Sequence, residues 1–105
     1  MTPGTMDITL QEAGSGGRYV WRGGPDMPEA EMTFSRAGSL RIIDHTGVPD
    51  AYKGQGIGLV LVTRAVEDAR AEGSKILPLC PFAAAMFRKH PDWSDVLADQ
   101  ARPKG

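Results

Sequence analysis

The sequence predicts an α/β domain, and three features of the chain support that prediction. Apolar and polar residues alternate in several segments of the first half, as they do in strands with one buried face. In the second half, apolar residues recur at helical spacing over residues 59–72. The glycine-rich residues 53–58 join the two regions at a strand-to-helix junction. Because 105 residues with 41% hydrophobic content can bury one modest core, we expect a single domain over residues 1–105.

The first half of the chain contains four expected strands, at residues 6–12, 18–22, 30–35 and 40–45. A glycine-rich turn at residues 14–17 joins the first two into a hairpin. In the third, apolar residues at every second position predict one solvated face. The fourth has adjacent apolar residues, so we expect it to be central in the sheet.

The second half is expected to add a helix, a strand and a second helix. The core-facing residues of the first helix are expected to be Leu61, Val62, Ala65, Val66 and Ala69. Gly73 is the expected stop of this helix. Residues 75–79 then form a buried strand parallel to residues 40–45, because a helical crossover connects parallel neighbours. Residues 82–90 form the second helix, and a short polar tail begins at about residue 98.

Two prolines predict that the sheet opens at the end of the fifth strand. Pro78 and Pro81 lack an N–H group, so the strand cannot keep a full hydrogen-bond ladder there. Pro81 also suits the first position of the helix that follows, which places Cys80 near its N-cap. The helix dipole favours a thiolate at that position, so Cys80 is a candidate reactive thiol.

The junction at residues 53–58 has the chemistry of an anion-binding loop. Glycines let the backbone approach a ligand closely, and the following helix offers unpaired N–H groups and the positive end of its dipole. A phosphate-bearing cofactor is therefore expected. The spacing matches neither the P-loop nor the dinucleotide-binding pattern; what remains is a basic residue, two further residues, then Gly-x-Gly.

This pattern resembles the Arg/Gln-x-x-Gly-x-Gly/Ala acetyl-CoA loop of the GNAT superfamily of N-acetyltransferases, with Lys53 where the family usually has Arg. Further segments are similar to the short NATD-type branch of that superfamily. They are residues 45–49 (His-Thr-Gly-Val-Pro), 78–82 (Pro-Leu-Cys-Pro-Phe) and 87–93 (Phe-Arg-Lys-His-Pro-Asp-Trp). The resemblance covers nearly the whole chain, from about Met6 to Leu97.

The resemblance implies a mixed, mostly antiparallel sheet with flanking helices, in which the parallel strands at residues 40–45 and 75–79 splay apart. It also implies acetyl-CoA as the cofactor, with its pantetheine arm in that gap. The strand end at Thr46 and Val48 would orient the thioester, and the loop would hold the pyrophosphate. The loop residues implied for cofactor binding are Lys53, Gly54, Gln55, Gly56, Ile57, Gly58 and Leu59.

Cys80 and His45 are the candidate catalytic residues. The resemblance implies that Cys80 takes the acetyl group from CoA or touches the thioester; the alternative is a small buried apolar residue. His45 could deprotonate an incoming ammonium group, because imidazole titrates close to neutral pH, or it could only form a hydrogen bond at the strand end. If both residues were functional, they would converge from adjacent strands.

Two positions depart from the family pattern. Gly47 stands where the NATD-type His-Thr-x-Val-Pro motif commonly has a larger residue, often Glu, so any acid-base role of that side chain is absent. Lys53 keeps the positive charge of Arg but lacks its planar fork. Arg88 and Lys89 could meet the distal phosphates of CoA or serve as dipole partners at a helix end. The aromatic residues expected simply to pack are Trp21, Phe34, Phe87 and Trp93.

The expected function is acetyl-CoA-dependent transfer of an acetyl group to an amine, which could be a protein lysine, a protein N-terminus or a small amine. The alternatives are a non-catalytic module that binds CoA or an acyl-CoA, and an interaction domain without a cofactor. The formal net charge of −1, without a long basic run, argues against nucleic-acid binding.

The composition also argues against other classes of site and location. No apolar run reaches the length of a membrane span, and two histidines with one cysteine give no metal-ligand cluster. A single cysteine cannot form an internal disulfide, so we expect a reducing compartment and a cytoplasmic protein. The expected state is a monomer or weak dimer.

Overall fold

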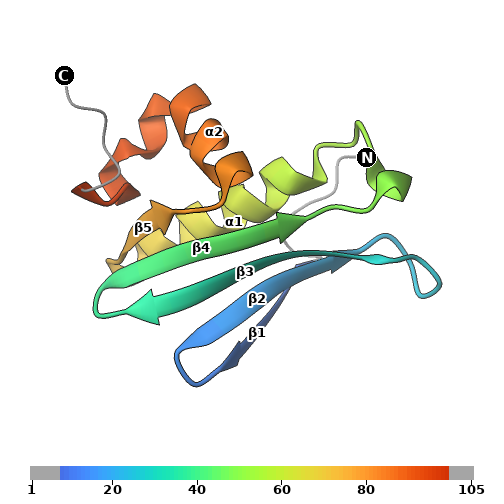
Figure 1. Cartoon of the computed structure of the whole chain (residues 1–105), viewed down its shortest axis with the longest axis horizontal. Helices are drawn as coiled ribbons and strands as arrows, with labels where there is room; N and C mark the ends of the chain where they lie inside the picture. The colour runs from blue at the N-terminus through green and yellow to red at the C-terminus, as the bar shows by residue number, and fades with distance from the viewer. Residues whose placement is uncertain (1–7, 100–105) are drawn as a thin grey trace.

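The computed structural model describes residues 8–99, in which a five-stranded sheet carries two α-helices and two 3-10 helices (Figure 1). The strands are β1 (Thr9–Ala13), β2 (Gly16–Arg22), β3 (Glu29–Ala37), β4 (Leu40–Gly47) and β5 (Lys75–Pro78). The helices are η2 (Asp50–Tyr52), α1 (Ile57–Glu72), α2 (Pro81–Lys89) and η3 (Pro91–Val96).

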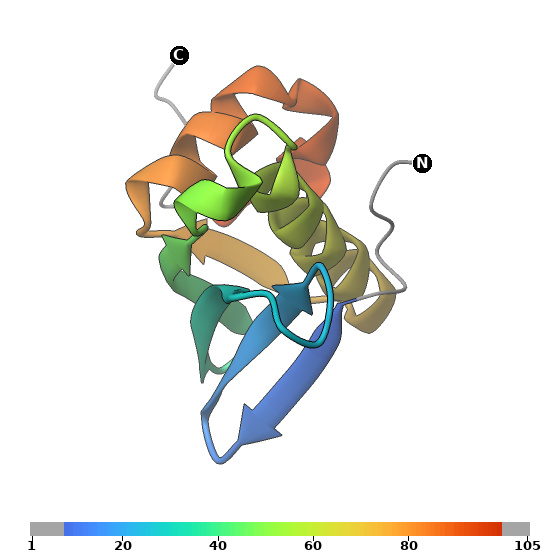
Figure 2. The same ribbon diagram turned by 90° about the vertical axis from the view of Figure 1, so that its right-hand side faces the viewer.

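The sheet follows the order of the chain, β1-β2-β3-β4-β5. Strands β1 to β4 pair antiparallel with their neighbours, and β5 pairs parallel with β4 after the crossover through α1. Helix α1 lies along one face of the sheet, and α2 lies at the β4–β5 end (Figure 2). The mixed, mostly antiparallel α/β fold predicted from the sequence is therefore confirmed.

The turn of the hairpin between β1 and β2 is shorter than the predicted turn at residues 14–17. The turn contains only Gly14 and Ser15, because Gly16 and Gly17 already pair with β3. Gly14 has a φ of 61°, which a glycine adopts without strain. The predicted start of the first strand at Met6 lies outside the described residues, and within them β1 begins at Thr9.

The core lies between the sheet and α1. All the α1 residues predicted to face it are buried, and so are the aromatic residues expected to pack, which are Trp21, Phe34, Phe87 and Trp93. Burial of such side chains contributes about 1.5–3 kcal/mol each relative to exposure.

The polar tail was predicted to begin at about residue 98. Ala98 is instead buried, and its N–H donates to the Ile76 carbonyl at 2.8 Å.

A polar network fixes α1 to the sheet at its C-terminal end. Arg41 of β4 is only 3% exposed, and its guanidinium donates two hydrogen bonds to Glu72, at 2.8 and 3.0 Å. It also donates to the Tyr19 hydroxyl, which donates to Asp68 of α1 at 2.8 Å. Hydrogen bonds from Arg41 and Arg36 hold the pKa of Glu72 well below its ordinary value. The network therefore connects β2 and β4 to the C-terminal half of α1.

The pairing of β4 with β5 ends at Ile43 and Pro78. The Leu79 and Cys80 N–H groups both donate to the Ile43 carbonyl, at 3.1 and 3.0 Å, and the chain then turns into α2. The rest of β4, beyond Ile43, pairs with β3 on one side but has no strand partner on its β5 side in the described chain. The two prolines therefore coincide with the predicted opening.

Both α-helices lie within two residues of their predicted bounds. Gly56, with a φ of 74°, is the N-cap of α1, so this helix begins at Ile57, two residues before the predicted start. Gly73 ends it in the left-handed conformation. In α2, Cys80 is the N-cap and Pro81 occupies the first turn. Over residues 8–99, no helix is both long and apolar enough to cross a membrane.

Candidate functional site

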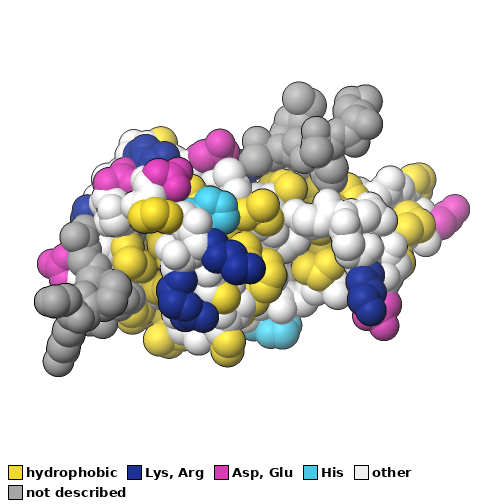
Figure 3. Space-filling view, turned by 90° about the horizontal axis from the view of Figure 1, so that it is seen from above, with side chains coloured by type: hydrophobic (Ala, Val, Ile, Leu, Met, Phe, Trp, Pro, Cys, Tyr) yellow, Lys and Arg dark blue, Asp and Glu magenta, His cyan; other side chains and the backbone are white. Residues whose placement is uncertain are grey.

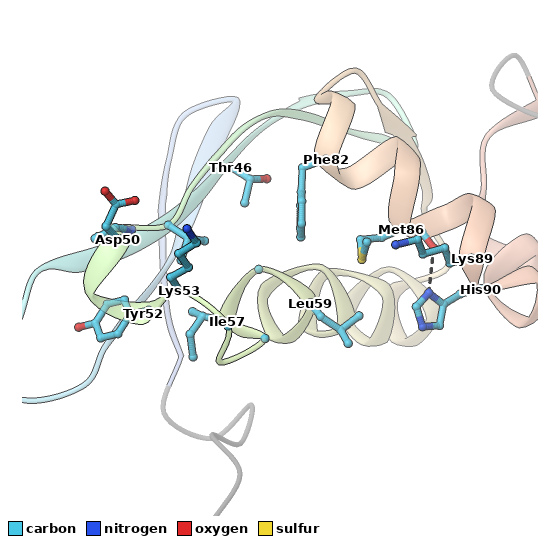
Figure 4. Close-up of a pocket in the computed structure, with 15 residues that line it drawn as sticks. Thr46, Asp50, Tyr52, Lys53, Ile57, Leu59, Phe82, Met86, Lys89 and His90 are labelled. Atoms are coloured by element: carbon cyan, nitrogen blue, oxygen red, sulfur yellow. Dashed lines mark hydrogen bonds between the residues drawn. The ribbon is translucent and has the colours of Figure 1, made fainter.

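A cleft of about 640 Å³ lies between the loop before α1, the first turn of α1 and one side of α2 (Figure 4). All cofactor residues implied by the sequence line it except Gln55. They are Thr46, Val48, Lys53, Gly54, Gly56, Ile57, Gly58 and Leu59. The cleft therefore joins the end of β4 to the glycine loop.

The N–H groups at the start of α1 form one wall of this cleft. The first helical bond of α1 runs from Val60 N–H to the Gly56 carbonyl at 3.1 Å. Among the described residues, the N–H groups of residues 56–59 have no acceptor. The Gln55 N–H, in contrast, donates to the Tyr52 carbonyl at 3.1 Å. The expected anion cradle thus narrows to residues 56–59.

Lys53 adds an uncommitted positive charge to the cradle. Its side chain lies in the cleft near Asp50, the one carboxylate among the residues that line it (Figure 4). Within residues 8–99 Lys53 forms no ion pair, whereas Arg18, Arg22, Arg36 and Arg70 are each paired with a carboxylate. The charge of Lys53 is therefore available to a phosphate.

The Phe82 ring stands inside the cleft, between Thr46 on one side and Met86 on the other (Figure 4). It packs directly on Gly58, where a Cβ atom would lie 2.5 Å from the ring Cζ. Phe82 is 38% exposed, so part of it faces the open cleft. Gly58 thus allows α2 to approach the first turn of α1 closely.

Cys80 lies just behind the cleft, at the opening between β4 and β5. Its Sγ donates a hydrogen bond to Thr46 Oγ1 at 3.4 Å, and the residue is 5% exposed. Burial raises the pKa of the thiol, but the hydrogen bonds that the ionised sulfur would accept from the Thr46 hydroxyl and the Ala83 and Phe82 N–H groups outweigh it and leave the pKa below its ordinary value. The surroundings of Cys80 therefore make the thiol easier to ionise than an ordinary cysteine.

His45 lies on the opposite face of the sheet. A bulge in β4 leaves Asp44 without a partner, so His45 pairs with Thr33 and Thr46 pairs with the buried Met32. His45 is exposed, and its Nε2 is 3.1 Å from the position of a Cβ atom on Gly47. Within the described chain no hydrogen bond joins His45 to Cys80, so the two candidates do not converge.

A second hollow, of about 450 Å³, adjoins the cleft on the His45 side. It is lined by Glu29, Glu31 and Gly47, and it shares Val48 and Pro49 with the cleft. Arg18 donates to Glu31 at 2.6 Å and to Glu29 at 3.2 Å, so the carboxylates are partly neutralised. The end of β4 is thus accessible from both faces of the sheet.

Sequence analysis named Lys89 as a candidate phosphate contact, but it missed the other residues of the cleft wall at α2. This wall consists of Phe82, Met86, Lys89 and His90. Their spacing of three and four residues places them on one side of a helix, and that signal was available. Tyr52 also lines the cleft, and its hydroxyl donates to the Pro28 carbonyl at 2.6 Å, but a single residue in a short turn carries no periodic signal.

The described residues contain no group of three or more His, Cys, Asp and Glu placed to hold a metal ion. The class of the protein is an α/β domain with an opened β4–β5 pair and a glycine-lined cleft at the start of α1. The chain belongs to the GCN5-related N-acetyl-transferase family, whose model matches residues 18–96.

Comparison with solved structures supports this assignment. The chain is similar to a GCN5-like protein from Staphylococcus aureus, described as a candidate N-acetyltransferase from its NMR solution structure. The two share 30% sequence identity over 88% of this chain and 89% of the other, with a TM-score of 0.67. No curated protein matches the chain. The family and the shared fold identify the protein as an N-acetyltransferase and confirm the predicted superfamily.

Proposed function

We propose that this protein transfers the acetyl group of acetyl-CoA to the nitrogen of an amine. One observation carries the proposal: the free N–H groups of residues 56–59 and the Thr46 side chain lie in one cleft, where β4 separates from β5. The N–H groups suit a diphosphate, and the Thr46 side chain suits the end of an extended chain that carries a thioester.

The residues of the cleft fit the donor along its length. Unpaired N–H groups and the Lys53 ammonium would hold the diphosphate. The unpartnered edge of β4 beyond Ile43 offers backbone groups to an extended arm with amide bonds, and Thr46 and Val48 would orient its end. When bound, acetyl-CoA supplies an acetyl group already activated as a thioester.

We assign to His45 the removal of a proton from the acceptor ammonium. The imidazole lies on the same face of the sheet as the hollow lined by Glu29 and Glu31, and it is a suitable general base for an amine there. An amine that enters there approaches the open end of β4 from the side opposite α1. The acceptor amine could belong to a protein lysine, a protein N-terminus or a small amine.

Relay through Cys80 is the alternative chemical route. The Cys80 thiolate would attack the thioester carbonyl carbon, the carbon–sulfur bond to CoA would break, and CoA would leave as a thiolate. The amine would then take the acetyl group from the Cys80 sulfur. The hydrogen bond from Thr46 and the lowered pKa of Cys80 favour this route, whereas direct attack requires fewer steps.

A non-catalytic CoA-binding module is the second candidate function. It is favoured by Gly47, which offers no side chain next to His45, and by the separation of His45 from Cys80 on different faces. Such a module would bind acetyl-CoA without releasing CoA in the presence of any amine.

Two measurements test the proposal. Titration calorimetry compares acetyl-CoA with acetyl-pantetheine, which lacks the diphosphate, and we expect tight binding only for acetyl-CoA. A thiol-release assay then offers a lysine peptide, a peptide with a free N-terminus and a polyamine. Absence of acetyl-CoA binding would overturn the proposal, whereas binding without release for all three amines would establish the second candidate.

A further inference from the structure

The cleft continues beyond the anion cradle to a second positively charged end. From Lys53 and the start of α1 it passes the Phe82 ring and reaches Met86, Lys89 and His90 near the end of α2 (Figure 4). The contacts assigned to the diphosphate and the thioester do not use this second end. The nucleoside end of acetyl-CoA has not been placed, and this second end of the cleft is open to it.

Neighbouring cations in the last turn of α2 face different hollows. Lys89 lines the cleft, whereas Arg88 lines another hollow of about 740 Å³ next to β5 and η3, which shares only His90 with the cleft. Seen from above, Lys or Arg side chains and a histidine lie among hydrophobic side chains (Figure 3). Because the helix dipole would favour both cations equally, it does not account for the position of Lys89 in the cleft.

Lys89 is available to a ligand. Within residues 8–99 it forms no ion pair or hydrogen bond, and the only carboxylate that lines the cleft, Asp50, lies at the opposite end (Figure 4). The C-terminal end of a helix repels anions, so an anion at this place requires a compensating side-chain charge. Lys89 supplies that charge.

His90 is held in a defined orientation beside Lys89. Its Nδ1 is 2.8 Å from the Met86 carbonyl, which can only accept, so Nδ1 carries the hydrogen of that bond. The ring also stacks on Trp93 with a centroid distance of 4.1 Å. Nε2 is left without a partner in the described chain, and in this tautomer it can accept a hydrogen bond from a ligand hydroxyl or amino group.

We propose that Lys89 binds the 3′-phosphate of coenzyme A, so that the cleft selects the 3′-phosphorylated donor over its dephospho form. The inference rests on the proposed function, because it assumes the diphosphate at residues 56–59 and the thioester beside Thr46. The nucleoside is attached to the diphosphate on the side away from the thiol, so it must occupy the remaining end of the cleft. Leu59, 38% exposed, and Met86 give that end an apolar wall for a base.

Calorimetry with acetyl-CoA and 3′-dephospho-acetyl-CoA tests this assignment. The wild type is expected to bind acetyl-CoA roughly 3- to 30-fold more tightly than the dephospho form, as a charge-assisted contact near the surface would give. Lys89→Met should lose most of that preference, and Lys89→Arg should keep it. Arg88→Met is the matched control, since it removes a neighbouring charge from the other hollow and should leave the preference unchanged.

The outcomes separate this inference from the proposed function. Equal affinity of the wild type for both ligands, or the same loss of preference in Arg88→Met as in Lys89→Met, would overturn the 3′-phosphate site while leaving the proposed function intact. Failure of the wild type to bind either ligand would overturn both. Thermal unfolding of each variant verifies that the exposed substitutions leave the fold unchanged.

Discussion

The Sγ of Cys80 lies 3.4 Å from Oγ1 of Thr46, and this hydrogen bond joins the start of α2 to the end of β4 where β4 and β5 have separated. It is a polar contact at the open end of the sheet, between a candidate nucleophile and a residue that lines the cleft. The same contact lowers the pKa of the thiol, so Thr46 affects the reactivity of Cys80 as well as its position.

Thr46→Val is expected to raise the pKa of Cys80, because a thiolate loses its hydroxyl donor while the valine side chain has nearly the same shape. The pH profile of Cys80 alkylation by a small reagent should move to higher pH. Thr46→Ser keeps the hydroxyl and is expected to retain the wild-type profile. An unchanged profile in Thr46→Val would show that Thr46 does not control the thiol.

Gly58→Ala should weaken acetyl-CoA binding without unfolding the protein. The new methyl group would lie 2.5 Å from Phe82 Cζ and push the ring into the cleft, while alanine itself is favoured in a helix by about 0.5–1 kcal/mol. We expect an affinity loss of roughly 3- to 10-fold. Calorimetry in a Phe82→Ala background should show no further effect of Gly58→Ala; an equal loss there would contradict the contact.

Gly56→Ala is expected to reduce stability for a different reason. There is open space for the new methyl group, but the φ of 74° places an L-residue in the left-handed region, at a cost of roughly 1–2 kcal/mol. Chemical denaturation measures this loss. A stability equal to that of the wild type would mean that the loop readily changes conformation.

Glu72→Gln should destabilise the protein at neutral pH by roughly 1–3 kcal/mol, since the buried Arg41 loses its charged partner. The folded pKa of Glu72 lies below its unfolded value, so its contribution is complete above the unfolded pKa and disappears as pH falls toward the folded pKa. The difference between wild type and variant should therefore shrink below about pH 5. Urea denaturation from pH 7 to pH 3 measures it, and a constant difference would argue against the charged pair.

His45→Gln is expected to lower kcat by roughly 100-fold or more if the imidazole acts as the general base. The side chain is exposed, so stability should stay near that of the wild type, and acetyl-CoA affinity should be unchanged. Steady-state kinetics and calorimetry give both quantities. Cys80→Ala provides the comparison: if it abolishes turnover while His45→Gln does not, the relay route replaces direct attack.

Much of the fold followed from local patterns in the sequence. The five strands and two α-helices were correctly predicted because their periods of two and 3.6 residues are properties of neighbouring residues, whereas the 3-10 helices η2 and η3 were not predicted. Gly73 ends α1 because glycine readily adopts the left-handed conformation at a helix terminus. Pro78 coincides with the end of β4–β5 pairing because proline has no N–H to donate. Both effects are local to the residue. The glycine loop was likewise located by its composition alone.

The candidate site depended on relations between distant residues, and only the tertiary structure decided them. Simple alternation from the buried Ile43 would have placed His45 on the core face, but the bulge at Asp44 shifts the register by one residue and turns His45 away. The Gln55 N–H donates to the Tyr52 carbonyl within a turn, so it is not available to an anion. Lys89 lines the cleft, whereas Arg88 does not. Sequence by itself determined the elements and the chemistry of the loop, because those are local. The face that each side chain presents was decided by packing, because it depends on pairing partners far away along the chain.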